Sequence, residues 1–216
     1  MRVSQLAHEI RNILQPVEYH LGLLEMRETS DPVQLRAMAV VPQQMRLLQQ
    51  VLLNASTLDQ PIEVRPRKLD LGRCVRALVS QLSLEPIAKG VKIVIHPEPE
   101  PFPISADEYW FPQALEQLLR NAIEALADCP RQDVRVEIGD EGAQVSVSIY
   151  DSGRGIDPKI EACLFEPFAS IKKHGGAGLG LPIARKIIES HGGIVSLKNS
   201  PEGTCARVSI PRGVAI

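Results

Sequence analysis

The sequence predicts an α+β protein with two parts, a helical hairpin in residues 1–60 and an α/β sandwich in residues 61–216, whose sheet is mixed and mainly antiparallel. Apolar residues in the first 58 positions recur at helical spacing. Beyond residue 70, helical runs occur in blocks with runs in which apolar and polar residues alternate. The segment Pro61-Ile-Glu-Val-Arg-Pro66 separates the two patterns, so we interpret it as the link between two domains.

Two amphipathic helices are predicted in the first part, over residues 2–28 and about 34–58, with a break at Thr29-Ser-Asp-Pro32. Pro42 lies inside the second run and is expected to kink or interrupt it. A single hairpin cannot cover its own apolar stripe. We therefore expect two copies of the chain to pair as a dimeric four-helix bundle.

The second part is expected to alternate between helices and strands. The predicted helices cover about 71–89, capped by Asp70, then 108–127 and 182–191. The predicted strands cover 91–95, 134–138, 145–149, 194–197 and 205–210, with a turn near Asp140-Glu-Gly142. The prolines between His96 and Pro103 predict a loop.

Composition narrows the class of protein. The net charge of −2 gives no indication of a nucleic-acid partner. No apolar run approaches the roughly 20 residues of a membrane span, and no signal peptide precedes the first helix. The four cysteines form no CxxC pair, which favours reduced thiols in a cytoplasmic protein.

The first candidate for chemistry is His8, in the string Leu6-Ala-His-Glu-Ile-Arg-Asn12. Glu9 can orient the imidazole or take a proton from it, and Asn12 lies one turn later on the same helix face. The alternative is an ordinary surface histidine. The structural interpretation is favoured for His20, His96 and His191, and His174 stays ambiguous.

Asn121 is the second candidate, on a polar face of the predicted helix 108–127 that also carries Gln117 and Glu124. A magnesium ion that arrives with a nucleotide needs only one or two protein oxygens, and one asparagine carbonyl can provide one. The alternative is a plain solvated helix face.

Asp151 and the glycines that follow it are the third candidate. An aspartate at a buried strand end can accept the amino hydrogen of adenine, while Gly153 and Gly155 leave room for a ring. Asp-Ser-Gly is also an ordinary turn sequence. Further on, Gly176-Ala-Gly-Leu-Gly180 enters a helix, whose N-terminus favours phosphate. It is not a Rossmann fingerprint, because no parallel βαβ unit precedes it.

In this order and spacing, the motifs resemble the catalytic core of two-component sensor histidine kinases over nearly the full chain. The resemblance implies a dimeric helical hairpin followed by an ATP-binding sandwich of the gyrase type. The matching boxes are the phosphoacceptor box Leu6–Asn12, the asparagine box Leu118–Ala125, the first glycine box Asp151–Ile156, the phenylalanine box Leu164–Phe168 and the second glycine box Gly176–Leu181.

The resemblance implies that His8 accepts the phosphoryl group, that Glu9 is its acid–base partner, and that Asn12 orients a water for dephosphorylation. It further implies that Asn121 holds Mg²⁺ and that Asp151 holds the adenine. The other nucleotide-binding residues that it implies are Gln117, Gly153, Gly155, Lys172, Lys173, Gly176, Gly178, Leu179, Gly180 and Thr204, with residues 165–178 as a mobile lid.

The sequence departs from the family pattern at three of these places. Ile13 stands where the family often has proline, so the first helix is expected to be straighter beside His8. Glu124 stands where many members carry lysine, and Gln117 where many carry asparagine.

The function expected from the resemblance is an ATP- and Mg²⁺-dependent protein-histidine kinase in two-component signal transduction. It would autophosphorylate on His8, pass the phosphoryl group to an aspartate of a response-regulator receiver domain, and also act as that regulator's phosphatase. A sensor domain or sensor protein is expected outside this chain, because only seven residues precede His8. The alternatives are a phosphotransfer or scaffold module with a degenerate ATP domain, and a gyrase-like ATPase.

Overall fold

The computed structural model describes residues 57–96, 101–169 and 178–213, together with Ile10, Leu14, Pro16, Val17, Tyr19, Val41, Met45 and Asn54. The chain divides into two compact units, Met1–Pro61 and Ile62–Ile216, which are described separately. In the first unit the isolated described residues are all helical. The hairpin, its pairing with a second copy and the effect of Pro42 concern residues outside the described set, so they remain predictions.

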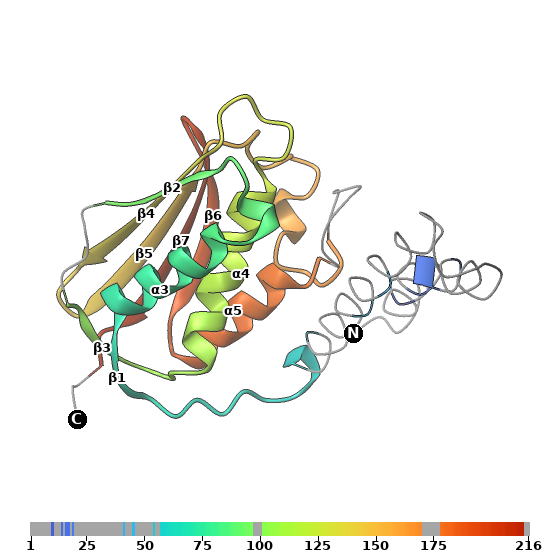
Figure 1. The fold of residues 1–216 in the computed structure, drawn as a ribbon. Helices are drawn as coiled ribbons and strands as arrows, with labels where there is room; N and C mark the ends of the chain where they lie inside the picture. Colours follow the sequence, from blue (N-terminus) through green and yellow to red (C-terminus); the bar gives the residue numbers. More distant parts are fainter. Residues whose placement is uncertain are drawn as a thin grey trace, which may run out of the picture. The chain divides into compact units, whose positions relative to one another are not determined.

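The second unit has two layers, with three helices packed on one face of a five-stranded sheet (Figure 1). The strand order is β2-β4-β5-β7-β6, and a separate two-stranded sheet joins β1 and β3 at one end. The helices are α3 Leu71–Ser83, α4 Trp110–Glu124 and α5 Gly180–Ser190. The strands are β1 Arg67–Asp70, β2 Lys92–Ile95, β3 Pro103–Ala106, β4 Asp133–Asp140, β5 Gln144–Asp151, β6 Ile194–Ser200 and β7 Gly203–Pro211.

Strand pairing confirms the predicted mixed, mainly antiparallel sheet. Among the described strands of the five-stranded sheet, β2 and β4 pair in parallel, and β4–β5, β5–β7 and β6–β7 are antiparallel. Alternate residues of β4, β5 and β7 face the helices and are buried, as the period of two requires. The buried residues of the three strands include Val134, Val136, Val145, Val147, Ile149, Ala206, Val208 and Ile210.

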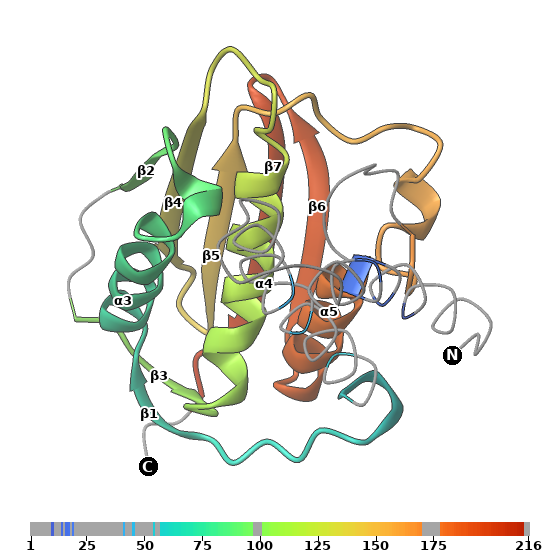
Figure 2. The same cartoon turned by 45° about the vertical axis from the view of Figure 1, so that its right-hand side comes forward.

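Helix α4 lies at the centre of the helical layer and packs on α3, α5 and β5 (Figure 2). Its buried face carries Phe111, Leu115, Leu118, Leu119, Ala122 and Ile123. These residues recur every three or four positions, which is why the helix presents one apolar face to the sheet and its neighbours. The core is therefore almost wholly aliphatic, with Phe111 as its one fully buried aromatic side chain among the described residues.

The helix predicted over 71–89 is shorter than expected. Asp70 caps it as predicted, because its Oδ1 accepts a hydrogen bond from the Arg73 N–H at 3.1 Å. The helix then ends at Ser83, and a separate 3₁₀ turn, η1, covers Pro86–Ala88. Pro86 explains the break, since proline has no N–H to continue the helix and disfavours helical geometry in the residue before it.

Strands β1 and β3, which have four residues each, were not predicted from the sequence. Both runs are too short for a clear alternation, and β3 begins at Pro103 within the segment that was expected to be a loop. They pair antiparallel, with Arg67 opposite Ala106 and Asp70 opposite Pro103. This small sheet brings the link after Pro61 to the start of α4.

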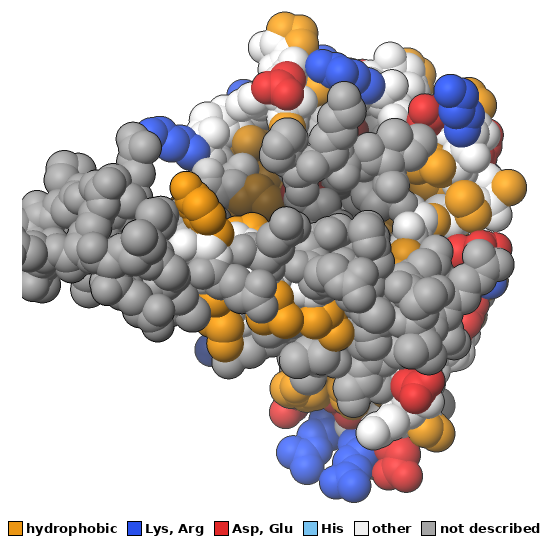
Figure 3. Space-filling model, turned by 90° about the vertical axis from the view of Figure 1, so that its right-hand side faces the viewer, with side chains coloured by type: hydrophobic (Ala, Val, Ile, Leu, Met, Phe, Trp, Pro, Cys, Tyr) orange, Lys and Arg blue, Asp and Glu red, His pale blue; other side chains and the backbone are white. Residues whose placement is uncertain are grey.

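In the described part of the chain, no helix combines the length and the apolar character that a membrane span requires. Among the described residues visible in Figure 3, Lys and Arg side chains lie near Asp and Glu side chains. Several of the charges of the second unit are paired, for example Arg185 with Glu189 and Arg212 with Asp140, both at 2.7 Å.

Candidate functional site

One row of residues crosses the sheet on the face that the helices cover. Val134 of β4, Asp151 of β5, Thr204 of β7 and Asn199 of β6 are in register with one another. Asp151 and Thr204 are polar but only 5% and 7% exposed. Buried polar side chains are costly unless they are hydrogen-bonded, so the partners of this carboxylate matter for the stability of the row.

The Asp151 carboxylate is fixed by two backbone donors. Its Oδ1 accepts hydrogen bonds from the Gly153 N–H at 2.9 Å and from the Thr204 N–H at 3.3 Å. The first donor belongs to the loop that follows β5, and the second belongs to the neighbouring strand. The carboxylate is therefore held in one orientation beside Thr204 at the end of the sheet.

Two glycines allow the chain to pass closely around this carboxylate. A β-carbon at Gly153 would lie 2.8 Å from Asp151 Oδ1 and 3.0 Å from the Ala125 carbonyl oxygen, too close for a side chain. A β-carbon at Gly203 would clash with the Asp151 carbonyl oxygen. The Asp151 carboxylate thus lies near the C-terminal end of α4. The chain passes close to Asp151 at Gly153 and Gly203, where a larger residue would clash.

Asn199 closes the loop after Asp151 and was not predicted from the sequence. Its Oδ1 accepts a hydrogen bond from the Ile156 N–H at 2.7 Å. Gly155, whose φ is +79°, passes beside the same oxygen, since a β-carbon there would lie 2.8 Å from it. Asn199 lies one residue before the end of β6 and opposite Thr204. This position is known only once the strand pairing is known, so the sequence alone did not reveal it.

A stripe on α4 connects this region with the start of α5. Gln117, Asn121 and Ala125 are four residues apart and so share a helix face, with about 6 Å between successive members. Gln117 Oε1 would lie 2.8 Å from a β-carbon at Gly180, the first residue of α5, and Ala125 lies against Gly153. Asn121 is therefore halfway between the N-terminus of α5 and the Asp151 carboxylate.

The N-terminus of α5 is suited to an anion. Its first turn contains no acidic residue, and Leu179, which precedes it, provides no side-chain cap. The first backbone N–H groups of a helix point outward along its axis and favour negative charge. Leu179 is fully buried, so it anchors this end of the helix in the core.

Phe168 and Gly178 hold together the two ends of the segment between them. The Phe168 N–H donates to the Gly178 carbonyl oxygen at 3.0 Å. Both residues have positive φ, +65° in each case. A β-carbon at Gly178 would lie 3.0 Å from the Phe168 Cα. The chain therefore leaves at Phe168 and returns at Gly178 in one place, directly before α5.

Arg120, which precedes Asn121, fastens the other side of α4. Its guanidinium makes two hydrogen bonds to the Glu85 carboxylate, at 2.8 and 2.6 Å, and one to Glu116 at 2.8 Å. Burial lowers the pKa of Arg120, but the two carboxylates outweigh that effect and raise it overall. This ion pair ties α4 to the 3₁₀ turn after α3 and was also missed from the sequence.

The remaining predicted site residues lie outside the described residues. They are His8, Glu9, Asn12, Lys172, Lys173 and Gly176. The structure brings together the others, which are Gln117, Asn121, Asp151, Gly153, Gly155, Gly178, Leu179, Gly180 and Thr204, along one line from the end of β5 to the start of α5.

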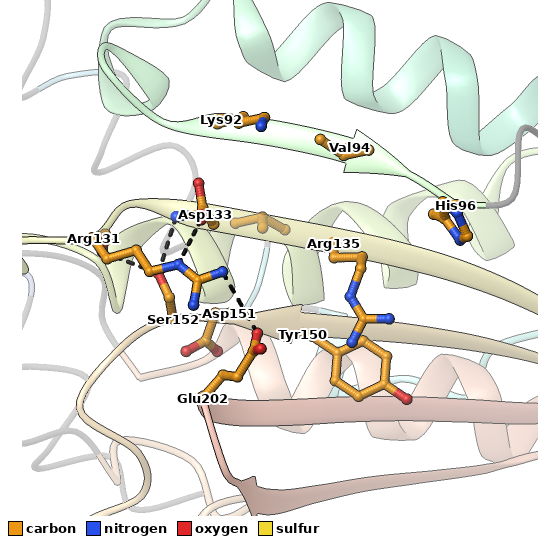
Figure 4. A pocket seen from close by; sticks show the side chains of 11 residues that line it. Lys92, Val94, His96, Arg131, Asp133, Arg135, Tyr150, Asp151, Ser152 and Glu202 are labelled. Atoms are coloured by element: carbon orange, nitrogen blue, oxygen red, sulfur yellow. Dashed lines mark hydrogen bonds and ion pairs between the residues drawn. The ribbon is translucent and has the colours of Figure 1, made fainter.

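A hollow of about 200 Å³ lies on the opposite face of the sheet (Figure 4). Arg131 pairs there with Asp133 at 2.6 Å and with Glu202 at 3.8 Å, and Arg135 lies 4.3 Å over the Tyr150 ring. Ligand pockets usually have about 300–1,000 Å³, and these charges pair with one another. Asp151 contributes to the wall, but its Oδ1 is bonded on the α4 side, so this hollow is not the site described above.

Comparison with known proteins identifies the class. The family model "Histidine kinase-, DNA gyrase B-, and HSP90-like ATPase" matches residues 106–214, which is half of the chain. The chain belongs to this family, and the matched part contains the whole row and stripe described above. The second unit is accordingly an ATP-binding fold.

Among individual relatives, the signal transduction histidine-protein kinase AtoS of Escherichia coli K12 is 27% identical over 200 residues, which cover 92% of this chain and 32% of AtoS. The sensory histidine kinase/phosphatase NtrB of Rhizobium meliloti is 27% identical over 223 residues, which cover 96% of this chain and 57% of NtrB. The chain thus spans about a third of the first relative and just over half of the second.

A solved structure agrees with this placement. The crystal structure of full-length ShkA in complex with AMPPNP superimposes with a TM-score of 0.70 and 25% identity, covering 100% of this chain and 47% of ShkA. The similarity to the catalytic core of sensor histidine kinases, inferred from the motifs, is thereby confirmed.

Proposed function

We propose that this chain is the catalytic core of a protein-histidine kinase, which transfers the γ-phosphoryl group of ATP to His8 and then to an aspartate of a response regulator. One observation carries the proposal. The site geometry of an ATPase family occurs in a chain whose similarity to a named histidine kinase covers 92% of its length, well beyond the ATPase part. A gyrase-like ATPase gives the segment around His8 no role.

At one end of the site we assign Asp151 to the adenine. A carboxylate oxygen held by two backbone donors cannot easily turn away, so it presents a fixed acceptor to the exocyclic amine. Thr204 lies beside it, and Gly153 and Gly155 keep the loop clear of the ring. Guanine has an oxygen where adenine has this amine, so the arrangement favours ATP over GTP.

At the other end we assign the phosphates to the N-terminus of α5 and to Gly176, Gly178 and Gly180. Leu179 anchors this turn, and Lys172 and Lys173 would neutralise phosphate charge. Asn121, halfway along the stripe, fits a Mg²⁺ ion because its amide oxygen is a hard donor and lies between the base end and the phosphate end. When bound, the ion would offset charge on the transferring phosphoryl group.

For the acceptor we assign His8, with Glu9 removing its proton and Asn12 orienting the water that hydrolyses the regulator's aspartyl phosphate. The name of NtrB, a kinase/phosphatase, supports a second, phosphatase activity. We further propose that the chain works as a cytoplasmic homodimer. The receiver domain of a response regulator would be its substrate, and its signal would come from a sensor domain or protein outside this chain.

Labelling with radioactive ATP tests the proposal. With Mg²⁺ present, label from γ-labelled ATP should stay on the protein, and label from α-labelled ATP should not. The product should be labile to acid and stable to alkali, as a phosphoramidate is. Hydrolysis of ATP without any protein label would favour the gyrase-like alternative. A failure to bind ATP would favour the scaffold alternative.

A further inference from the structure

Asp107 lies between β3 and α4. It is at the opposite end of α4 from Ala125, which lies against Gly153 of the loop after β5. It is 7% exposed, and it does not belong to the row or the stripe of the nucleotide site. Figure 2 shows β1, β3, the first turn of α4 and the last turn of α5 at this same end. Asp107 makes hydrogen bonds to three of the segments that meet here.

The first segment is the link that follows Pro61. Asp107 Oδ2 accepts a hydrogen bond from the Arg65 N–H at 2.7 Å. Arg65 precedes β1 by two residues, and the β1–β3 ladder ends where Arg67 faces Ala106. The carboxylate thus fixes the link two residues beyond the end of the β1–β3 pairing.

The second segment is α4. Asp107 Oδ1 accepts hydrogen bonds from the N–H groups of Tyr109 and Trp110, both at 2.9 Å. Trp110 is the first residue of α4, and Tyr109 directly precedes it. The Trp110 N–H has no partner within the helix, so the carboxylate holds the start of α4 in place. The same helix carries Gln117, Asn121 and Ala125.

The third segment is the end of α5. The Asp107 N–H donates to His191 Nε2 at 3.1 Å, and His191 Nδ1 lies 2.8 Å from the Ile187 carbonyl oxygen. When Nε2 accepts, Nδ1 can donate to the Ile187 carbonyl oxygen, so both ring nitrogens have a partner. The other end of this helix begins at Gly180. Asp107 is therefore connected to both helices that frame the nucleotide site.

The two carboxylate oxygens bind different segments, Oδ2 the link and Oδ1 the start of α4, and both accept hydrogen bonds. Burial raises the pKa of Asp107, but the N–H groups of Trp110, Arg65 and Tyr109 lower it below its usual value. The group is ionised at neutral pH. An asparagine could accept from α4 through its one oxygen, but its NH₂ would then face the Arg65 N–H, donor against donor.

We infer that Asp107 is a positioning residue, which fixes the link to the start of α4 and so sets how the ATP-binding unit is attached to the segment that carries His8. This inference rests on the proposed kinase function. The link then forms a joint whose fixed end is at Arg65. This joint affects the rate of phosphoryl transfer to His8 but not the affinity for ATP.

Two variants break the joint from its two sides in the full-length chain. Asp107→Asn keeps an acceptor for α4 and loses the acceptor for Arg65. Arg65→Pro removes the Arg65 N–H and leaves the carboxylate intact, at a position that already precedes Pro66. Glu63→Pro is the matched control, because it places the same ring in the same link without touching this bond.

Three quantities are measured: ATP affinity by calorimetry, the rate of His8 labelling from γ-labelled ATP, and hydrogen exchange of the Arg65 amide. In Asp107→Asn the Arg65 amide should exchange about tenfold faster, as expected for a lost hydrogen bond to a charged group. Labelling should be about tenfold slower in Asp107→Asn and Arg65→Pro, on the same basis. ATP affinity should stay within about twofold of the wild type, and Glu63→Pro should label at the wild-type rate.

Arg65→Pro that labels as fast as Glu63→Pro would overturn the inference. So would an ATP affinity that falls in step with labelling, because Asp107 would then act through the folding of the nucleotide site. If the wild type binds ATP but takes no label, the proposed kinase function fails. In that case the exchange rate of the Arg65 amide still tests whether Asp107 holds the link. An unchanged exchange rate in Asp107→Asn would refute that attachment.

Discussion

Asp151 shows how far single residues could be predicted. Its place at a strand end before two glycines was visible in the sequence, and the structure puts it in a buried row beside Thr204. Asn199 and Asp107 were not visible in this way. Their partners, Ile156 and Arg65, are 43 and 42 positions away in the chain. Only the fold brings such pairs together, so local motifs carry no signal for them.

Asp151→Asn is expected to weaken ATP binding by about 30-fold, roughly 2 kcal/mol, because the amide places a donor where the adenine amine also donates. Calorimetry should show this loss with ATP, while Asp157→Asn, the same change in the exposed part of the following loop, should leave affinity close to wild type. Unchanged ATP affinity in Asp151→Asn would contradict the assignment of the base.

Gly178→Ala is expected to destabilise the fold more than Gly142→Ala. Both residues have positive φ, +65° and +76°, so each alanine costs about 1–2 kcal/mol in backbone strain. At Gly142 nothing lies within 4 Å of the added carbon, whereas at Gly178 it meets Phe168 Cα at 3.0 Å. The clash should add about 1 kcal/mol or more. Urea unfolding measures both variants, and equal losses would show that Phe168 can move aside freely.

At the scale of elements, the long periodic segments were predicted well. The apolar spacing placed α4 and α5, and the alternation placed β4, β5 and β7, within a few residues of their bounds. The errors lie where a local break or a distant partner decides the structure. Pro86 ended α3 early, and β1 and β3 form only because they pair with each other.

Asp70, the cap of α3, should make stability depend on pH. The Arg73 N–H lowers its pKa, burial opposes this, and the Phe102 N–H adds to the lowering. A carboxylate with a lowered pKa in the fold stabilises it above its ordinary pKa of about 4, and this contribution is lost as the pH falls through the lower folded value. In urea titrations, the free energy of unfolding should be larger for the wild type than for Asp70→Asn at pH 7. This difference in free energy should shrink towards pH 3. A difference that stays constant over this range would exclude the cap as its source.

At the scale of the whole molecule, the chain consists of two units that are joined at about residue 61. The second unit has its own core and an ATP-binding fold, and half of the chain matches one ATPase family. The apolar stripes of the first unit could be read from sequence. The dimeric four-helix bundle expected from these stripes involves residues outside the described set, so it stays a prediction.

The full chain is expected to be a homodimer through residues 2–58. Light scattering at micromolar concentration should give about twice the chain mass of 23.7 kDa. Residues 62–216 alone should give a monomer, because they lack both predicted amphipathic helices. A full-length monomer under these conditions would remove the basis for a four-helix bundle.

The most direct test of the account is the site of phosphorylation. We expect His8→Ala to bind ATP as tightly as the wild type but to take up no label from γ-labelled ATP. His20→Ala is the matched control, on the same predicted helix but without an adjacent acid, and it should label at the wild-type rate. Normal labelling of His8→Ala, or loss of labelling in His20→Ala alone, would contradict the central claim that this ATP-binding unit phosphorylates His8.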